Sequence, residues 1–308
     1  MTEEAPVLCI LGPTASGKSA LALEVAEKTG GEIVSCDSAQ VFRGLDVGTA
    51  KATVEEQARV PHHLIDQIPP DAQWTAAEFA QRADKAVAEV RARGRLPILC
   101  GGTGLWYRAW LRGIFEAPPI SAALRAQVLA WLEDEGSAAV HARLARHDPK
   151  AAARIPAGDP QRIGRALEYF LQTGQPISEA QDEHGFRGQR YAVRAFGLTW
   201  PRALSWERIR ARTEWMYRHG LLEEAEAALR TASPDAPGLR IIGYRDAVRV
   251  VLGKTTLAEA VDATSIATRQ FAKRQRNWFN QETLRWLDGQ LSVETLASMV
   301  LDPPLPSA

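Results

Sequence analysis

The sequence is poor in cysteine and has no long apolar run. Its three cysteines, Cys9, Cys36 and Cys100, stand in short apolar stretches and match no zinc-ligand spacing, so we expect buried reduced thiols and no disulfide or metal centre made of cysteine. No stretch approaches the roughly 20 apolar residues of a membrane span, and the acidic N-terminus is no signal peptide. These absences predict a cytoplasmic protein with no membrane partner.

The chain also lacks an excess of charge, although its charge is unevenly distributed. Lys and Arg number 37, as do Asp and Glu, which argues against a simple polycation. Between residues 239 and 286, however, nine basic residues stand against four acidic ones. This local surplus suits an anionic partner, but it also suits a solvated helical face.

One segment matches a phosphate-binding loop, the pattern G-x-x-x-x-G-K-[ST]. It consists of Gly12, Pro13, Thr14, Ala15, Ser16, Gly17, Lys18 and Ser19. An apolar run at 7–11 precedes it, and apolar residues at helical spacing follow over 19–28, which is the strand–loop–helix context that the motif needs. Backbone N–H groups, the helix dipole and the Lys18 ammonium would hold a polyphosphate, and the Ser19 hydroxyl would hold Mg²⁺.

Strand and helix signals alternate in the first third of the chain. Further strands are expected at 32–36, 62–66 and 96–100, and a capping box at Thr75 and Glu78 opens a helix that runs to about residue 93. A glycine-rich corner at 101–104 leads into another helix at 105–111. The alternation predicts an α/β fold, a P-loop NTPase-like parallel sheet flanked by helices. Asp37 follows the second strand and should lie beside the phosphate loop if the first two strands are neighbours.

The pattern changes after a linker at 116–120. Residues 121–181 show helical signals and almost no strand signal, with Ser121 capping one helix and Asp159 capping another that begins at Pro160. A strand is expected at 191–198, and helices at 204–219, 221–230, 243–252 and 256–287. We therefore expect a core of residues 1–117 and 190–308, interrupted by a mostly helical insert at 118–189.

The last long helix carries a basic stripe. Arg269, Lys273 and Arg276 recur at i, i+4 and i+7, and three apolar residues on roughly the opposite face are expected to dock on the core: Ala267, Phe271 and Trp278. A basic stripe anchored by aromatic rings suits a phosphate backbone, and a salt-bridged surface helix fits the spacing about equally well. Other residues favour RNA by adding charge and one stacking ring: Arg162, Arg165, Arg240, Tyr244 and Arg245.

Two polar residues are candidates for chemistry, and each has a structural alternative. Asp37 is a general base beside the transferred group, or else a helix cap or a carboxylate near Mg²⁺. Thr103 orients a substrate amine or merely caps the following helix. Cys100 has no basic neighbour that would make it a nucleophile, and the pair His62 and His63 has no further ligand at metal-binding spacing.

Eight motifs together resemble the bacterial tRNA dimethylallyltransferase family, also called the IPP transferase family. They lie at 12–19, 37–40, 44–51, 61–66, 101–105, 159–163, 242–245 and 269–275, and the resemblance covers about residues 6–286. It implies transfer of a dimethylallyl group from dimethylallyl diphosphate to N6 of the adenosine just 3′ of the anticodon, position 37 of the tRNA. It also implies Mg²⁺ as cofactor, the tRNA anticodon stem-loop as partner, and a monomer.

The resemblance further implies roles for individual residues. Asp37 accepts the proton of the adenine amine with help from Thr103, the loop at 12–19 binds the diphosphate with Ser19 on Mg²⁺, and Arg208 or Arg212 clamps the diphosphate. The implied tRNA contacts are Asp37, Ser38, Ala39, Gln40, Thr103, Arg125, Gln161, Arg162, Ile163, Gly164, Arg165, Arg240, Ile241, Ile242, Gly243, Tyr244, Arg245, Lys273, Arg274, Gln275, Arg276, Asn277, Trp278, Phe279 and Asn280. Phe42 and Trp106 depart from the family, which often has tyrosine at both positions.

Three other functions share some of these features. A nucleotide kinase with a helical lid would have the same loop but transfer a phosphoryl group from ATP. A transferase acting on free AMP would not need the basic C-terminal helix. A nucleotide-switched RNA-binding protein would have both the phosphate loop and the basic C-terminal helix, but it would catalyse no reaction.

Overall fold

The structure is a computed structural model that describes residues 5–115, 118–184 and 188–302. Residues 116 and 117, the start of the expected linker, lie outside the described part. The chain divides into two compact units, one formed by Met1–Leu111 with Arg190–Ala308 and the other by Arg112–Gln189. The insert expected at 118–189 falls within the second unit.

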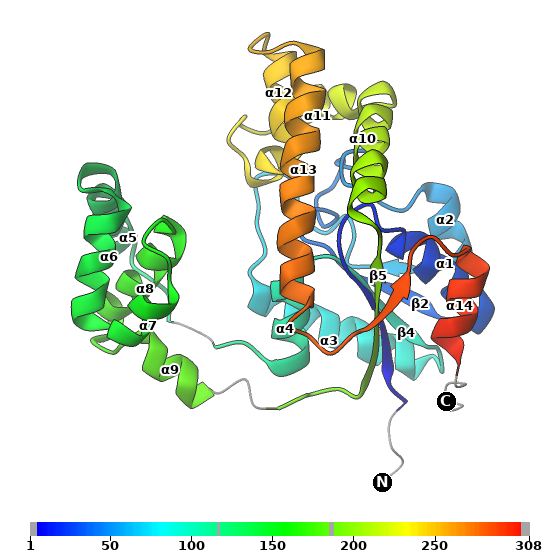
Figure 1. The fold of residues 1–308 in the computed structure, drawn as a ribbon, viewed down its shortest axis with the longest axis horizontal. Helices are drawn as coiled ribbons and strands as arrows, with labels where there is room; N and C mark the ends of the chain where they lie inside the picture. The colour runs from blue at the N-terminus through cyan, green and yellow to red at the C-terminus, as the bar shows by residue number, and fades with distance from the viewer. Residues whose placement is uncertain (1–4, 116–117, 185–187, 303–308) are drawn as a thin grey trace. The chain divides into compact units, whose positions relative to one another are not determined.

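The larger unit is built on one parallel sheet, in the order β3-β2-β4-β1-β5-β6 (Figure 1). Its strands are β1 (Val7–Leu11), β2 (Glu32–Cys36), β3 (His62–His63), β4 (Pro97–Gly101), β5 (Val193–Thr199) and β6 (Arg285–Asp288). Because β1 lies between β4 and β5, its carboxyl end is central on the edge where parallel sheets bind ligands. The predicted fold class, a parallel sheet flanked by helices, is confirmed.

Helices cover the sheet on both faces, because the central strands β1, β2 and β4 are buried along their whole length. Helices α1 (Lys18–Thr29) and α14 (Val293–Leu301) pack on one face, where Leu21 and Val300 share a core with Ile10, Ile98 and Phe196. Alternate strand residues point the other way. Helix α3 (Ala76–Ala92) packs on β2 and β4, and its predicted capping box at Thr75 is present. Two further helices are α2 (Val54–Arg59) and α4 (Gly104–Arg112).

A layer of C-terminal helices completes the larger unit. They are α10 (Arg202–Arg218), α11 (Leu221–Leu229), the 3₁₀ turn η1 (Pro237–Arg240), α12 (Tyr244–Val251) and α13 (Leu257–Phe279). Helices α10 and α13 pack along each other, as do α11 and α12. Helix α13 starts with a full capping box in which Thr256 accepts from the Glu259 N–H.

The helix predicted over 256–287 is wrong beyond Phe279. The chain leaves α13 there and forms β6, a strand that the sequence analysis missed. Tertiary packing explains the change: Leu287 is buried in the sheet core, and the Trp286 ring lies so close to Gly197 that a Cβ on this glycine would come within 2.6 Å of it. The strand expected at 62–66 is also shorter, since β3 ends at His63.

All regular secondary structure in the described residues of the second unit is helical. Its helices are α5 (Ala122–Asp134), α6 (Gly136–His147), α7 (Pro149–Arg154), α8 (Pro160–Thr173) and α9 (Ile177–His184). Ser121 and Asp159 cap α5 and α8 as predicted, and both accept a backbone N–H. Val128, Leu144 and Ile163 belong to a separate apolar core, as expected of a unit with its own stability.

The three cysteines are free and buried, as expected. Burial raises the pKa of the Cys100 thiol to about 11, which leaves it protonated at neutral pH and a poor nucleophile. Among the described residues, no helix has both the length and the apolarity needed to cross a bilayer.

Candidate active site

The phosphate-binding loop has the backbone conformation that its glycines predict. Gly12 and Gly17 have φ values of 131° and 96°, and Ala15 takes a left-handed φ of 60°. Gly17 is the residue just before α1, and it has no side chain that could accept a hydrogen bond from the first turn of the helix. The N–H groups of that turn are therefore available to an anion.

Lys18 lies at the base of this loop and is almost fully buried. Its Nζ lies 3.4 Å from the carbonyl oxygen of Pro13. Burial lowers the pKa of the Lys18 ammonium, while the nearby charge of Asp37 opposes this shift. A buried ammonium with few acceptors gains most from a strong anion, and this is what a diphosphate supplies.

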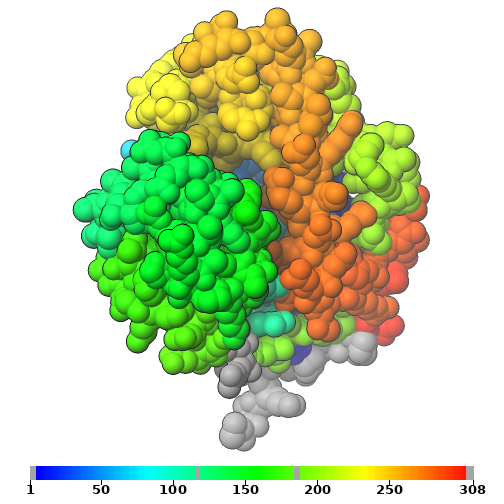
Figure 2. All heavy atoms as spheres, turned by 60° about the vertical axis from the view of Figure 1, so that its left-hand side comes forward, coloured from blue at the N-terminus to red at the C-terminus, as the bar shows by residue number. Residues whose placement is uncertain are grey.

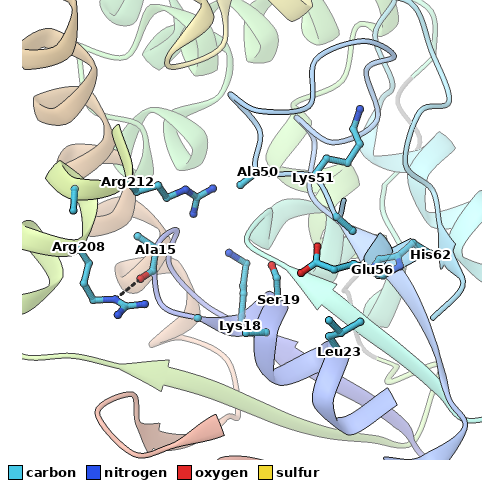
Figure 3. A pocket seen from close by; sticks show the side chains of 14 residues that line it. Ala15, Lys18, Ser19, Leu23, Ala50, Lys51, Glu56, His62, Arg208 and Arg212 are labelled. Carbon is cyan, nitrogen blue, oxygen red and sulfur yellow. Dashed lines mark hydrogen bonds between the residues drawn. The ribbon is translucent and has the colours of Figure 1, made fainter. Parts of the chain in front are cut away.

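Two arginines of α10 reach the loop from the side (Figure 3). The Arg208 Nε donates to the Ala15 carbonyl oxygen at 3.0 Å, and Arg212 Nη1 lies 3.4 Å from the Thr14 hydroxyl oxygen. Burial lowers the pKa of the Arg212 guanidinium, although an arginine of this kind stays cationic near neutral pH. The structure thus brings both predicted arginines to the loop, with Arg212 lining the cavities around Lys18.

Two cavities meet at the loop. One of about 500 Å³ extends from Lys18 toward Lys51, Glu56 and His62, and the labelled side chains of Figure 3 surround it. The other, of about 370 Å³, extends from Lys18 to the segment at 37–40. Both are lined by Ala15, Lys18, Ser19, Ala50 and Arg212. A diphosphate held at these shared residues would therefore face open space on two sides.

Asp37 lines the second cavity, although the reason differs from the one expected. Its strand β2 is not the neighbour of β1, because β4 lies between them. The carboxylate accepts the Ala39 N–H at 3.0 Å and shares its cavity with Lys18, Ser19 and Arg212. The condition set for this placement, that the first two strands are neighbours, is therefore not met, yet Asp37 and the loop share a cavity.

Thr103 acts on this turn directly. Its hydroxyl oxygen accepts the Ser38 N–H at 2.9 Å and lies 3.2 Å from the Ser38 hydroxyl, while its own N–H donates to the Cys36 carbonyl oxygen at 3.1 Å. The hydroxyl therefore fixes the backbone next to Asp37. Thr103 does not line the cavity that Asp37 lines. It lines another cavity of about 450 Å³, and Ser38 lines both of these cavities.

Close packing explains the glycine-rich corner after β4. A Cβ on Gly101 would lie 2.1 Å from the Cys36 carbonyl oxygen, one on Gly102 would lie 2.3 Å from Gln275 Nε2, and one on Gly104 would lie 2.1 Å from the Trp278 ring. These distances are far below van der Waals contact. The corner must therefore be glycine for β2 and α13 to approach it.

Gln275 links this corner to the phosphate loop. Its Oε1 accepts the Thr14 N–H at 2.8 Å and its Nε2 donates to the Gly102 carbonyl oxygen at 2.9 Å. The side chain is buried. Gln275 is one of the expected tRNA contacts, but in this structure both ends of its amide form hydrogen bonds inside the protein.

Other expected tRNA contacts are also buried in this structure, although Gly243 lines the cavity that Asp37 lines: Ile163, Gly164, Gly243, Tyr244 and Phe279. The expected stacking ring is among them. Tyr244 packs against Gly48, and its hydroxyl donates to Glu224 while accepting the Gly48 N–H at 3.1 Å. Glu224 also accepts the Val47 N–H at 2.9 Å. These residues organise the loop at 44–51, a role that the sequence pattern gave no signal for.

The remaining basic candidates are on the surface. Exposed members of the expected tRNA set are Ser38, Arg125, Gln161, Arg162, Arg165, Arg240, Arg245, Lys273, Arg274, Asn277 and Asn280, and half-buried ones are Asp37, Ala39, Gln40, Thr103, Ile241, Ile242, Arg276 and Trp278. Arg125 and Arg165 both approach Glu168 within the second unit. On α13, Ala267, Phe271 and Trp278 are all half-buried, and the Trp278 ring packs against Gly104 as expected of a residue that docks on the core. The fully buried residues of this stretch of the helix are Ala272, Gln275 and Phe279.

The residues at the loop fit Mg²⁺ bound through a substrate. No cluster of three or more His, Cys, Asp or Glu suited to a metal occurs among the described residues, so the protein offers no closed metal cage there. Mg²⁺ needs no such cage, because phosphate oxygens and waters supply most of its ligands. The Ser19 side chain lines both cavities beside Lys18, where it would contribute one oxygen.

The parallel sheet, its phosphate loop and the cavities beyond it define a P-loop-type α/β protein. The family model described as IPP transferase matches residues 40–282. A tRNA dimethylallyltransferase of Anaeromyxobacter sp. (strain Fw109-5) is 48% identical over 96% of this chain and 98% of that protein. One of Geobacter sulfurreducens is 40% identical over 96% of both chains.

A solved structure agrees with this assignment. The crystal structure of a tRNA delta(2)-isopentenylpyrophosphate transferase from Staphylococcus epidermidis has a TM-score of 0.70 and 36% identity, covering 97% of this chain and 98% of that one. The chain therefore belongs to the IPP transferase family, and the predicted resemblance is confirmed.

Proposed function

We propose that the protein transfers the dimethylallyl group of dimethylallyl diphosphate to N6 of the adenosine just 3′ of the anticodon, acting as a cytoplasmic monomer. Membership of the family and the names of its relatives support tRNA as substrate. The single observation that carries the chemistry is the cavity that joins the phosphate loop to Asp37 and to the surface at Arg240 and Arg274.

The loop neutralises the leaving diphosphate. Cleavage of the bond between the allylic carbon and the diphosphate oxygen leaves negative charge on the diphosphate, which Lys18, Arg212 and the N–H groups at the start of α1 stabilise in place. Mg²⁺ bound at Ser19 would add positive charge to the same oxygens. The buried Lys18 needs no reorganisation to do this, since it already faces the loop.

Asp37 takes the proton from the attacking amine. The N6 amine of adenine is a weak nucleophile, so its proton must leave as the new C–N bond forms. One bond to carbon forms, one breaks, and the proton ends on the Asp37 carboxylate. Thr103 is a positioning residue, because its hydrogen bond to the Ser38 N–H holds the turn that carries Asp37.

The adenine must leave its stack to reach this cavity, because the half-buried Asp37 carboxylate lines the cavity beside the phosphate loop. Extrusion of a base costs a few kcal/mol, and contacts to the RNA backbone offset that cost. The exposed side chains Arg240, Lys273 and Arg274 are placed to make such contacts, and Arg240 and Arg274 also line the cavity.

Labelled dimethylallyl diphosphate and tRNA test the proposal together. We expect label in the tRNA, located by nuclease digestion and mass spectrometry at the adenosine next to the anticodon. Asp37→Asn should lower kcat by about 10²–10⁴ and leave pyrophosphate affinity nearly unchanged. Asp235→Asn, an exposed carboxylate outside the cavities, is the matched control.

One result would contradict the proposed function, and another would contradict the role of Asp37. Transfer of the γ-phosphate of ATP to the RNA or to a nucleoside, with no alkyl transfer, would show a kinase. Retention of the parental kcat by Asp37→Asn would leave alkyl transfer in place but remove the assigned base.

A further inference from the structure

A third cavity, which we call the α10–α13 pocket, lies between two helices of the larger unit and outside the site described above. It has a volume of about 400 Å³. Its walls come from α10 through Arg202, Ser205 and Trp206 and from α13 through Arg269, Lys273 and Arg276. Pro13 of the phosphate loop closes one side, yet Lys18 and Asp37 do not reach it.

The charge of this pocket is not compensated. Its lining contains four cationic side chains and no carboxylate. None of the four forms an ion pair with a described carboxylate, and only Arg276 donates to a backbone carbonyl, that of Trp200. The same two helices do neutralise charge elsewhere, since Arg210 of α10 pairs with Asp262 of α13. The α10–α13 pocket therefore gathers like charges that no carboxylate in its lining offsets.

Arg269 has a buried donor with no acceptor. Its Nε is inaccessible to solvent and makes no hydrogen bond to any residue that the structure describes, which is unfavourable unless a ligand supplies the acceptor. The Trp206 ring holds two guanidinium groups together, because Arg202 lies 4.4 Å and Arg269 lies 5.0 Å from its centroid. Trp206 is 37% exposed, so the two arginines lie at a site that solvent reaches.

The start of α10 adds to the positive potential. The helix begins at Arg202 after Pro201, with no side chain capping its first N–H groups. A helix of 17 residues directs the positive end of its dipole toward an anion at that terminus. Arg202 and Ser205 of this first turn both line the pocket.

We propose that the α10–α13 pocket binds a backbone phosphate of the RNA. This inference rests on the proposed function. The pocket opens at exposed residues, Arg202, Lys273 and Asn277, and α13, drawn in orange in Figure 2, lies along the surface of its unit. Its donors are long side chains around an open mouth, which suit a polymer that passes over the surface better than a small enclosed ion.

Arg202→Ala combined with Arg269→Ala tests the proposal in the full-length protein. We expect tRNA affinity to fall about tenfold and the slope of log K against log[salt] to become shallower by about 1, the change produced by losing one phosphate contact. Affinity for inorganic pyrophosphate, which reports on the phosphate loop, should stay as in the parent. Arg202→Gln with Arg269→Gln repeats the test with less loss of packing around Trp206.

The control removes the same charge elsewhere. Arg59→Ala with Arg230→Ala deletes two surface arginines that are paired with Glu27 and Glu226 and lie outside the pocket. A tRNA affinity and salt slope in both pocket variants equal to those of this control would overturn the proposal. So would loss of tripolyphosphate binding with unchanged tRNA binding, because the pocket would then hold a free anion.

The outcomes separate this inference from the proposed function. If the parent alkylates tRNA and the pocket variants bind tRNA normally, only the pocket assignment fails. If the parent transfers no dimethylallyl group, the function fails, while the salt slope still reports whether the pocket contacts RNA.

Discussion

Replacing Gln275 with leucine tests how the basic helix is joined to the phosphate loop. Leucine has a similar size and is apolar, so Gln275→Leu removes the two hydrogen bonds without leaving a large cavity. The Thr14 N–H and the Gly102 carbonyl oxygen both lose their partner. The first belongs to the loop that is proposed to grip the diphosphate.

The expected cost follows from the burial of these groups. A buried donor or acceptor left without a partner costs about 1–3 kcal/mol, so two of them give roughly 2–6 kcal/mol. The bond to Thr14 is only partly buried and water will replace part of it, whereas the bond to Gly102 is buried. We therefore expect the free energy of unfolding to fall by about 2–4 kcal/mol.

Urea unfolding and pyrophosphate titration measure the two consequences. Gln275→Leu should lower the urea midpoint and weaken pyrophosphate binding, because the Thr14 segment is no longer held in place. Lys273→Ala, an exposed change on the same helix, should weaken tRNA binding and leave both other quantities unchanged. Parental stability together with parental pyrophosphate affinity in Gln275→Leu would refute the role assigned to this side chain.

Two further substitutions test the packing and the electrostatics of the sheet. Gly104→Ala places a methyl group 2.1 Å from the Trp278 ring and should lower the free energy of unfolding by about 1–3 kcal/mol. Gly158→Ala is the control, because no atom lies within 4 Å of the added methyl group, and it should have little effect. Thermal unfolding measures both variants, and equal melting curves would contradict this prediction. The hydrogen bond from Arg93 holds the pKa of the buried Glu32 carboxyl below its usual value. Ionised Glu32 therefore stabilises the fold at pH values above the usual, unfolded-state pKa. This contribution is lost as the pH falls through the lowered folded-state pKa. Acid unfolding should therefore be less steep in Glu32→Gln, and an unchanged pH profile would show that the pair contributes nothing.

Sequence patterns predicted local structure correctly wherever the residues of a motif also determine the backbone conformation of that motif. The phosphate loop is such a case, because Gly12 and Gly17 permit the positive φ values that the loop requires. The caps at Thr75 and Ser121 were predicted for the same reason, since the capping residue and the N–H that it satisfies are only a few positions apart.

Predictions were less successful where the structure depends on contacts between residues that are far apart in the chain. The helix expected to run to residue 287 ends at Phe279, because Leu287 finds burial in the sheet. Tyr244 was expected on the RNA surface from its basic neighbours, yet the carboxylate of Glu224 and the backbone of Gly48 hold it inside.

The sequence by itself determined the family, the phosphate loop and the parallel α/β class, because each depends on residues close together in the chain. Only the tertiary structure decided that β4 separates β1 from β2, that Gln275 connects α13 to the loop, and that Arg202 meets Arg269 across Trp206. These contacts join residues that are distant in the chain, and side-chain packing, which no local pattern encodes, selects them.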